Sequence, residues 1–316
     1  MSPLTVGGQA VLEGVMMRAP GVMCVAVRRL DGSIEIHRKM VPLSVEKYGF
    51  LRWPLVRGLV AVWQSLSLGF RALDYSSAVA IADIDRQESH PNKASEKNDS
   101  GSGMSTAALA AVLIGSLAIA VGFFFLLPLF LTDLAGRYIP VLRNNAILFN
   151  VFDGLIRVVF LILYIGAISL MPDIRRVFQY HGAEHKAIFT YEAGLELSTD
   201  NARHFSTLHR RCGTAFLLMV MVVAMLVFSF VPPSASLAIK AVSRIILLPV
   251  IAGLAFEVIR KSGQSSNRLL AIATIPGLWL QRLTTREPDD RQLEVGIAAL
   301  QAAITHAQSD QFDVIV

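Results

Sequence analysis

Four long apolar stretches, separated by polar segments, dominate the middle of the chain. They run over residues 104–131, 147–170, 213–231 and 237–259. A helix needs about 20 apolar residues to cross the hydrocarbon core of a bilayer, and each stretch has close to that length or more. The pattern therefore predicts four transmembrane helices within a membrane domain over residues 104–260.

Two of these stretches carry charged residues. Asp153 and Arg157 stand four residues apart in the second, and Lys240, Arg244 and Glu257 occur in the fourth. Charges at membrane depth are costly and usually face the protein interior. We therefore expect them to pair across the bundle or along one helix.

The first 45 residues have a different pattern. Residues 22–30 and 33–41 are apolar or alternating, and they flank Asp31-Gly32, a dipeptide typical of tight hairpin turns. The pattern predicts a small N-terminal β unit over residues 1–45 built on a β-hairpin.

The sequence patterns of the segments on either side of the membrane domain are less distinct. Within residues 46–86, an apolar stretch carries a stripe of Arg57, Gln64 and Arg71 at intervals of seven, which predicts an interfacial or re-entrant helix. Residues 87–103 are polar and rich in Gly and Ser, as in flexible linkers. Residues 261–316 hold an apolar stretch too short to span and then an amphipathic helix.

Composition supports a membrane protein. Hydrophobic residues make up 53% of the chain, charged residues 17%, and mean hydropathy is +0.53. The net charge of +5 comes from basic residues that flank the apolar stretches, so they orient the chain in a bilayer and do not indicate nucleic-acid binding. Their distribution predicts a predominantly α-helical, polytopic protein of the cytoplasmic membrane. Both termini and the loop over residues 171–212 are expected to be cytoplasmic.

The candidate chemistry lies in that loop, in the stretch YHGAEHK (residues 180–186). The preceding Pro172-Asp173 predicts a helix start and Gly194 its end. His181 and His185 are then one turn apart on one face, a spacing that can chelate a metal ion. Glu184 completes an H-x-x-E-H order, in which the glutamate serves as general base in some zinc proteases.

Two histidines do not complete a metal site. The nearest further candidates are His209 and Cys212, spaced H-x-x-C before the third apolar stretch, and Glu192 and His204 are additional candidates. Four ligands would form a closed site, typical of structural Zn²⁺; three would leave a position open for catalysis. The sequence leaves both alternatives open, and the pair could equally be a polar patch beside the membrane.

Four separated motifs resemble the YqhQ-like family of bacterial membrane proteins: GGQAVLEGVMMRAP (residues 7–20), YHGAEHK, HRRCGT (residues 209–214) and LTTREPDDRQLEVGIAAL (residues 283–300). The resemblance implies an integral protein of a bacterial cytoplasmic membrane, in a family of unknown function sometimes described as metal-dependent enzymes. It implies no substrate. The family's usual proline before Arg-Cys is replaced here by Arg210.

The other motifs offer less specific chemistry. Glu13 and Arg18 are either a structural ion pair or a clamp for an anionic substrate. Thr284 or Thr285 is expected to cap the C-terminal helix.

Three functions are therefore compatible with the sequence. The first is a membrane hydrolase dependent on Zn²⁺ or another divalent transition metal. The second is a scaffold or assembly factor with a structural zinc, and a transporter or channel comes third, because no internal repeat is visible. Apart from the lipid bilayer, the sequence indicates no partner.

Overall fold

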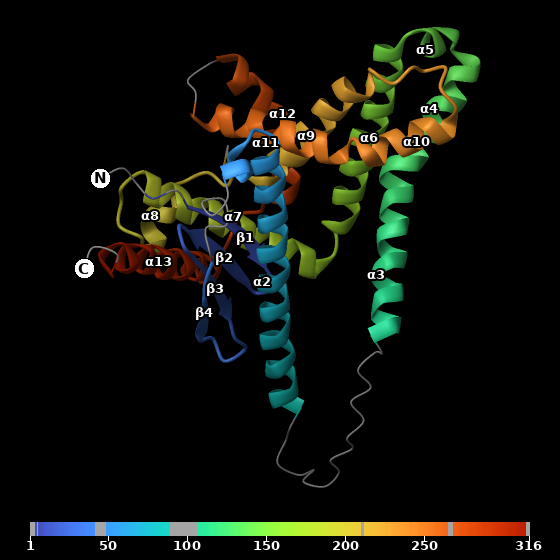
Figure 1. The fold of residues 1–316 in the computed structure, drawn as a ribbon. Helices are drawn as coiled ribbons and strands as arrows, with labels where there is room; N and C mark the ends of the chain where they lie inside the picture. Colours follow the sequence, from blue (N-terminus) through green and yellow to red (C-terminus); the bar gives the residue numbers. More distant parts are fainter. Residues whose placement is uncertain are drawn as a thin grey trace.

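The computed structural model describes residues 4, 6–41, 49–88, 106–209, 212–264 and 268–313. Within them a four-stranded sheet is followed by helices to the C-terminus. Figure 1 shows two bodies: the sheet with α7, α8 and α13 on one side, and α3 to α6 with α10 on the other. Helices α9, α11 and α12 lie between them.

The sheet is an antiparallel meander, β1(Gly7–Val11), β2(Gly14–Ala19), β3(Val22–Arg28) and β4(Ile34–Met40), in sequential order. The expected hairpin is confirmed as β3 and β4, with Gly32 at a positive φ of 88° in its turn. β1 and β2, which the sequence did not predict as strands, extend it on one side.

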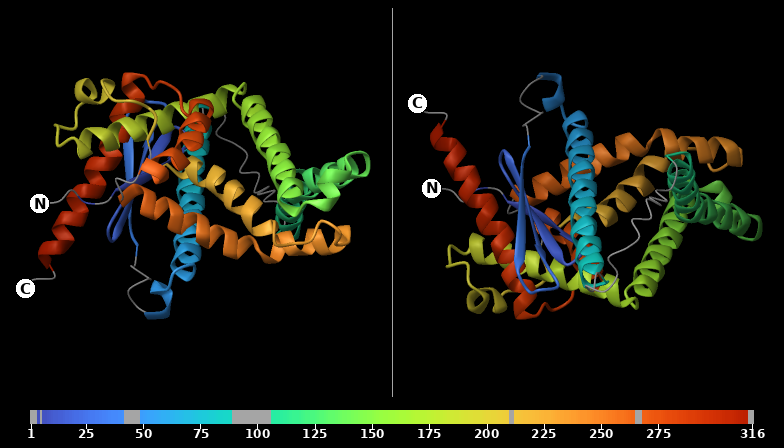
Figure 2. Two further views of the ribbon diagram at one scale, coloured as in Figure 1. Left: turned by 90° about the horizontal axis from the view of Figure 1, so that it is seen from above. Right: turned by 90° about the horizontal axis from the view of Figure 1, so that it is seen from below.

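Successive side chains of a strand point to opposite faces of the sheet, so the core has two layers, one on each face. On one face, buried residues of β2 and β3, among them Met17 and Cys24, pack with α7(Pro172–Glu192) and α13(Asp290–Asp313). On the other face, Met16 and Met23 pack against α2(Val56–Glu88). The sheet is thus sandwiched between helices, as Figure 2 shows from below, and its hydrophobic positions on both faces are covered.

The C-terminal segment ties α7 to α13. The Arg286 N–H donates to the Phe178 carbonyl across 2.9 Å, and the chain then enters α13. Here a Cβ on Gly182 would lie 2.1 Å from the Arg286 carbonyl oxygen. Only a glycine permits this approach of two backbones. Asp289 and Gln292 then cap α13 reciprocally, Asp289 Oδ1 accepting from Gln292 N and Gln292 Oε1 from Asp289 N.

The expected threonine cap of the C-terminal helix is therefore wrong. Thr284 is the last residue of α12(Arg268–Thr284), and the Thr285 hydroxyl donates back to the Gln281 carbonyl. Because α13 begins only at Asp290, the residue that caps it is Asp289.

Two helices in the described part of the chain are long and apolar enough to cross a membrane, Ile114–Tyr138 and Ala146–Ile168. The first combines α3(Thr106–Val121), a π-helical turn η2(Gly122–Leu126) and α4(Leu127–Tyr138), and the second is α6. They correspond to the first two predicted spans, although the first is displaced towards the C-terminus. A short α5(Pro140–Asn144) joins them.

The other two predicted spans take different forms. The third is α9(Gly213–Phe228), an apolar helix of 16 residues, about 24 Å long and shorter than a hydrocarbon core. The fourth is broken by 49° between α10(Leu237–Ile246) and α11(Leu248–Gln264), and together these could form one further span. The described residues thus contain two or three membrane-spanning elements by length and composition.

Helix α2 is longer than the interfacial helix expected from the sequence and connects the sheet to the membrane helices. Its glycine Gly58 approaches Gly253 of α11 so closely that a Cβ would lie 3.1 Å from the Gly253 Cα and O atoms. Beside this contact, Arg57 Nε donates to Glu257 across 2.5 Å. The predicted linker that follows α2 lies, from residue 89 onward, outside the described residues.

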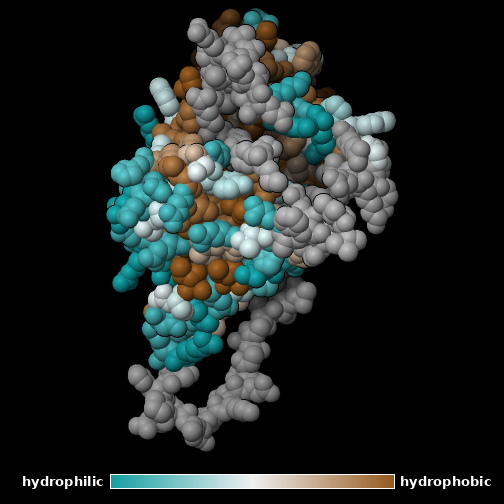
Figure 3. All heavy atoms as spheres, turned by 90° about the vertical axis from the view of Figure 1, so that its left-hand side faces the viewer, coloured by the Kyte–Doolittle hydropathy of each residue, from teal (hydrophilic) through white to brown (hydrophobic). Residues whose placement is uncertain are grey.

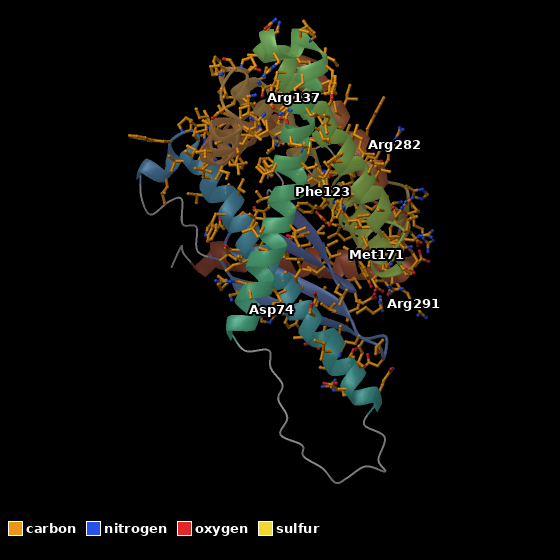
Figure 4. The ribbon with its side chains drawn as sticks, turned by 90° about the vertical axis from the view of Figure 1, so that its right-hand side faces the viewer. Asp74, Phe123, Arg137, Met171, Arg282 and Arg291 are labelled. Atoms are coloured by element: carbon orange, nitrogen blue, oxygen red, sulfur yellow. The ribbon has the colours of Figure 1, made fainter. Side chains whose placement is uncertain are left out.

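The two bodies differ in surface character. The face that carries α7, α8(Thr199–Arg203) and α13 is largely hydrophilic, with smaller apolar patches (Figure 3). By contrast, α3, α6 and α10 expose many large apolar side chains, including Ile119, Leu163 and Ile246. In Figure 4, Arg137 and Met171 lie at opposite ends of the membrane helices, with Met171 towards the sheet. The sheet body therefore lies at one end of the membrane helices.

The Gly182 contact generates a stability prediction. Gly182→Ala should destabilise the protein by about 1 to 3 kcal/mol, because the new methyl group meets a backbone carbonyl that cannot rotate away. Thermal unfolding in detergent measures this. Gly166→Ala in α6 is the control, since its Cβ would meet nothing within 4 Å; equal losses in both variants would contradict the packing.

Candidate metal centre

The predicted helix around YHGAEHK is confirmed as α7. Pro172 stands in its first turn, Asp173 follows, and Gly194 terminates it at a positive φ of 69°. Although its sequence is polar, α7 is buried from Gly182 to Ile188, because the sheet covers one side and α13 another. Its polar side chains are thereby removed from water and must find partners within the protein.

His181, His185 and Cys212 come together at one point. Each offers a ligand atom, and the three atoms lie within 4.8 Å of one another. His181 Nε2 is 3.1 Å from Cys212 Sγ, and the two imidazole rings are 4.5 Å apart between centroids. The two histidines that the i, i+4 spacing pairs on one helix face and the cysteine before the third apolar stretch thus form one cluster.

Backbone carbonyls set the tautomers of both imidazoles. His181 Nδ1 lies 2.8 Å from the Thr284 carbonyl oxygen, and His185 Nδ1 contacts the carbonyl of Thr207. A carbonyl only accepts, so each Nδ1 carries the proton and each Nε2 keeps a lone pair. Metal-ligating histidines are oriented in this way by acceptors behind the ring.

One of these lone pairs has no partner. His185 Nε2 is buried and makes no hydrogen bond, one of three such side-chain atoms among the described residues. A buried nitrogen without a partner is costly, and a metal ion held with His181 and Cys212 would satisfy it.

Cys212 is positioned by the start of α9. As the N-cap residue, its sulfur accepts from the Thr214 N–H across 3.4 Å and lies 3.1 Å from the Thr214 hydroxyl. These contacts hold the sulfur at the N-terminus of α9, on the side where His181 approaches it.

His209 is nearby but is not part of the three-atom cluster found among the described residues. Its ring is 5.5 Å from that of His185, and its Nε2 is 3.5 Å from Glu192 Oε2. Gln281 holds its backbone with two hydrogen bonds of 2.8 Å. Glu192 is thus placed beside His209 and not beside the cluster, and the exposed His204 ends α8 outside it.

Glu184 is buried on α7 against the edge strand of the sheet. The Gly8 N–H hydrogen-bonds to its carboxyl group, and a Cβ on Gly8 would lie 2.8 Å from Glu184 Cγ. Burial raises its pKa to about 7, partly offset by His181 and by the Gly8 hydrogen bond. Glu184 is not part of the three-atom cluster, although it precedes His185 directly on α7.

The structure adds contacts that the sequence pattern did not reveal. Lys186 is buried, donates to the Arg203 carbonyl across 3.0 Å and forms an ion pair with Glu287. Glu287 belongs to the TTREPDD stretch, and Asp290 of the same stretch pairs with Arg203. No spacing rule connects the partners of these two ion pairs, because they lie 101 and 87 positions apart in sequence.

Glu13 and Arg18 do not pair with each other. Glu13, at a positive φ of 50°, accepts from Arg176 Nε across 2.6 Å and from the Tyr180 hydroxyl across 3.3 Å. Arg18 donates to Gln64 of α2 across 2.9 Å. The expectation of a structural ion pair between them is wrong. Glu13 links the sheet to α7, and Arg18 links it to α2.

All four sequence motifs therefore converge on α7. The glycine-rich first motif supplies Gly8 against Glu184, and the cysteine motif supplies Cys212. The last motif supplies the Thr284 carbonyl behind His181 and the Arg286 backbone against Gly182. The cluster lies where the sheet body meets the ends of α9 and α12, as their positions in Figure 1 indicate.

Comparison with known proteins gives two matches. The family model described as "Protein of unknown function (DUF1385)" matches residues 53–306. The chain is also 37% identical over 304 residues to the "Uncharacterized protein YqhQ" of Bacillus subtilis (strain 168), covering 93% of this chain and 91% of that protein. No solved structure matches the chain significantly. Since both matches cover most of the chain, it belongs to this family of proteins of unknown function, the YqhQ-like family that its four motifs resemble.

Proposed function

We propose that the protein is a membrane-anchored hydrolase that holds Zn²⁺, or another divalent transition metal, with His181, His185 and Cys212. The single observation that carries the proposal is the buried, unpartnered Nε2 of His185 within a cluster whose ligand atoms lie within 4.8 Å of one another. Two nitrogens and one sulfur are a ligand set that Zn²⁺ prefers.

The ligand count favours catalysis over a purely structural site. Catalytic zinc sites use three protein ligands and keep a fourth position open, and a Cys/His/His set is compatible with that arrangement. A zinc ion there would supply Lewis-acid chemistry for hydrolysis. Glu184 lies between the two histidines on α7, and His181 is close enough to act electrostatically on its carboxyl group, so we assign Glu184 the proton transfer.

The alternative is a scaffold or assembly factor with a structural zinc. It is favoured if His209 turns from Glu192 towards the ligands and closes the shell, since its ring already lies 5.5 Å from that of His185. Glu13 and Arg18 would act as a substrate clamp only after leaving Arg176, Tyr180 and Gln64, so we give them no role in the reaction.

The proposed location is the cytoplasmic membrane of a bacterium, with both termini and the metal centre in the cytoplasm. The basic residues of the N-terminal region, of the loop before α9 and of the C-terminal tail support this orientation. The two cysteines, both free and buried, are compatible with a reducing compartment.

We expect the purified protein to contain about one metal ion per chain, and His185→Ala and Cys212→Ala to lose it, because each removes one of three ligands. Elemental analysis by mass spectrometry measures the metal. His204→Ala is the matched control, as it removes an exposed histidine outside the cluster. A wild-type protein without stoichiometric metal, or variants that keep it, would refute the site.

An open coordination position should be visible after substitution with Co²⁺. Adding azide should change the visible absorption spectrum of the cobalt protein, because an exogenous ligand can enter a three-ligand site. His209→Ala should retain the metal and the response. An unchanged spectrum, together with metal loss in His209→Ala, would instead support the scaffold with a closed site.

The orientation is tested by cysteine labelling of intact cells. A cysteine placed at exposed Tyr138, at the end of α4, should react with an impermeant maleimide. One at exposed Leu195, after α7, should react only after permeabilisation, because α6 crosses the membrane between them. The reverse pattern would place the metal centre outside the cytoplasm.

A further inference from the structure

A charge cluster lies inside the membrane helices, far from the metal centre. Asp153 of α6 accepts from Arg157 Nε across 3.1 Å and from Arg244 Nη2 of α10 across 2.9 Å. All three side chains are buried. The Asp153 position is 15 residues, or about 22 Å, from the end of α6 that leads into α7, so the cluster is separate from the histidines and Cys212.

The cluster holds more positive than negative charge. Both arginines are permanently protonated and share one carboxylate, which leaves one uncompensated positive charge. Lys240 does not change this balance, because it pairs with Asp133 across 2.8 Å. Within the described residues, no second carboxylate contacts either arginine.

Neutral groups of the protein stabilise the two guanidinium groups but do not neutralise the excess positive charge. Arg157 donates to the Phe125 carbonyl in the π-helical turn η2 across 3.3 Å, and Arg244 donates to Asn150 across 3.3 Å. Both guanidinium groups also face the Phe228 ring, at 5.8 and 4.8 Å from its centroid. Yet Arg244 Nε is buried with no hydrogen-bond partner, so one donor still lacks an acceptor.

The position of the cluster indicates where its counter-ion comes from. Asn150 and Asp153 are four and seven residues after Ala146, the first residue of α6, and therefore about 6 to 11 Å along the helix. Since α6, with 23 residues, is about as long as a hydrocarbon core is thick, this position is nearer to the headgroup phosphates of one leaflet than to the middle of the membrane. A phosphate oxygen is also a preferred acceptor for a guanidinium N–H.

We propose that Arg244 and Arg157 bind one phosphate group, supplied by a membrane phospholipid or by free phosphate. The bound group neutralises the excess charge and accepts the Arg244 Nε–H. The site would then make the membrane domain dependent on an anion from its surroundings, independently of the metal centre.

The proposal is tested with the full-length protein in detergent and in nanodiscs. We expect a saturable rise in the melting temperature on titration with inorganic phosphate at constant ionic strength, or on transfer from phosphatidylcholine to phosphatidylglycerol nanodiscs. Chloride should not reproduce the rise. A response to phosphate alone identifies free phosphate as the source, and a response to phosphatidylglycerol alone identifies the lipid; native mass spectrometry should show one bound molecule.

Matched variants separate the site from nonspecific charge effects. Arg244→Gln should lose the response, weakening binding at least 10-fold, while remaining as stable as wild type without phosphate, because Arg157 and Asp153 then form a neutral pair. If Arg244→Gln does not fold, Arg157→Gln replaces it and should lose the response in the same way. Arg137→Gln, which removes an exposed arginine, should respond like wild type. No response in wild type, an equal response to chloride, or wild-type binding by the Arg244 and Arg157 variants overturns the proposal.

Discussion

The burial of a polar helix is the constraint on which the rest of this structure depends. Helix α7 brings Glu184, His185 and Lys186 out of water on consecutive positions. Since a buried polar group without a partner costs as much as a lost hydrogen bond or more, each of them requires a partner from elsewhere in the chain. Gly8, the Thr207 carbonyl and Glu287 supply these partners, and the Nε2 of His185 is left without one. The sheet, the loop before α9 and the C-terminal segment are thus held around α7 by its own polar side chains.

This arrangement explains why the His181, His185 and Cys212 cluster and the fold are difficult to separate. The carbonyls that orient His181 and His185 belong to the end of α12 and to the loop before α9. Cys212 caps the N-terminus of α9, an apolar helix that packs against α12 and α11. Displacing any of these segments would therefore change both the packing of the sheet body and the direction of a ligand.

Features that depend on residues close in sequence could be predicted, and features that depend on contacts between distant segments could not. The bounds of α7 and the chelating spacing of its histidines could be read from the sequence, because Pro172, Gly194 and an i, i+4 interval are local signals. The pairing of His209 with Glu192, and the role of the Thr284 carbonyl, could not, because they depend on how distant segments pack. β1 and β2 were missed because their glycines weaken the strand pattern. The break between α10 and α11 could not be predicted, because the apolar content of a stretch indicates how long a helix can be and not whether its axis bends.

The glycine contact between α2 and α11 has a mechanical consequence. Gly58 and Gly253 let the two backbones touch, and Arg57 pairs with Glu257 beside them, so two contacts hold this end of α2 against α11. The other end extends along the sheet for most of its 33 residues, about 50 Å in all. A tilt of α11 by about 5° would therefore displace the far end of a rigid α2 by about 4 Å, with the helix acting as a lever between the lipid-facing helices and the sheet.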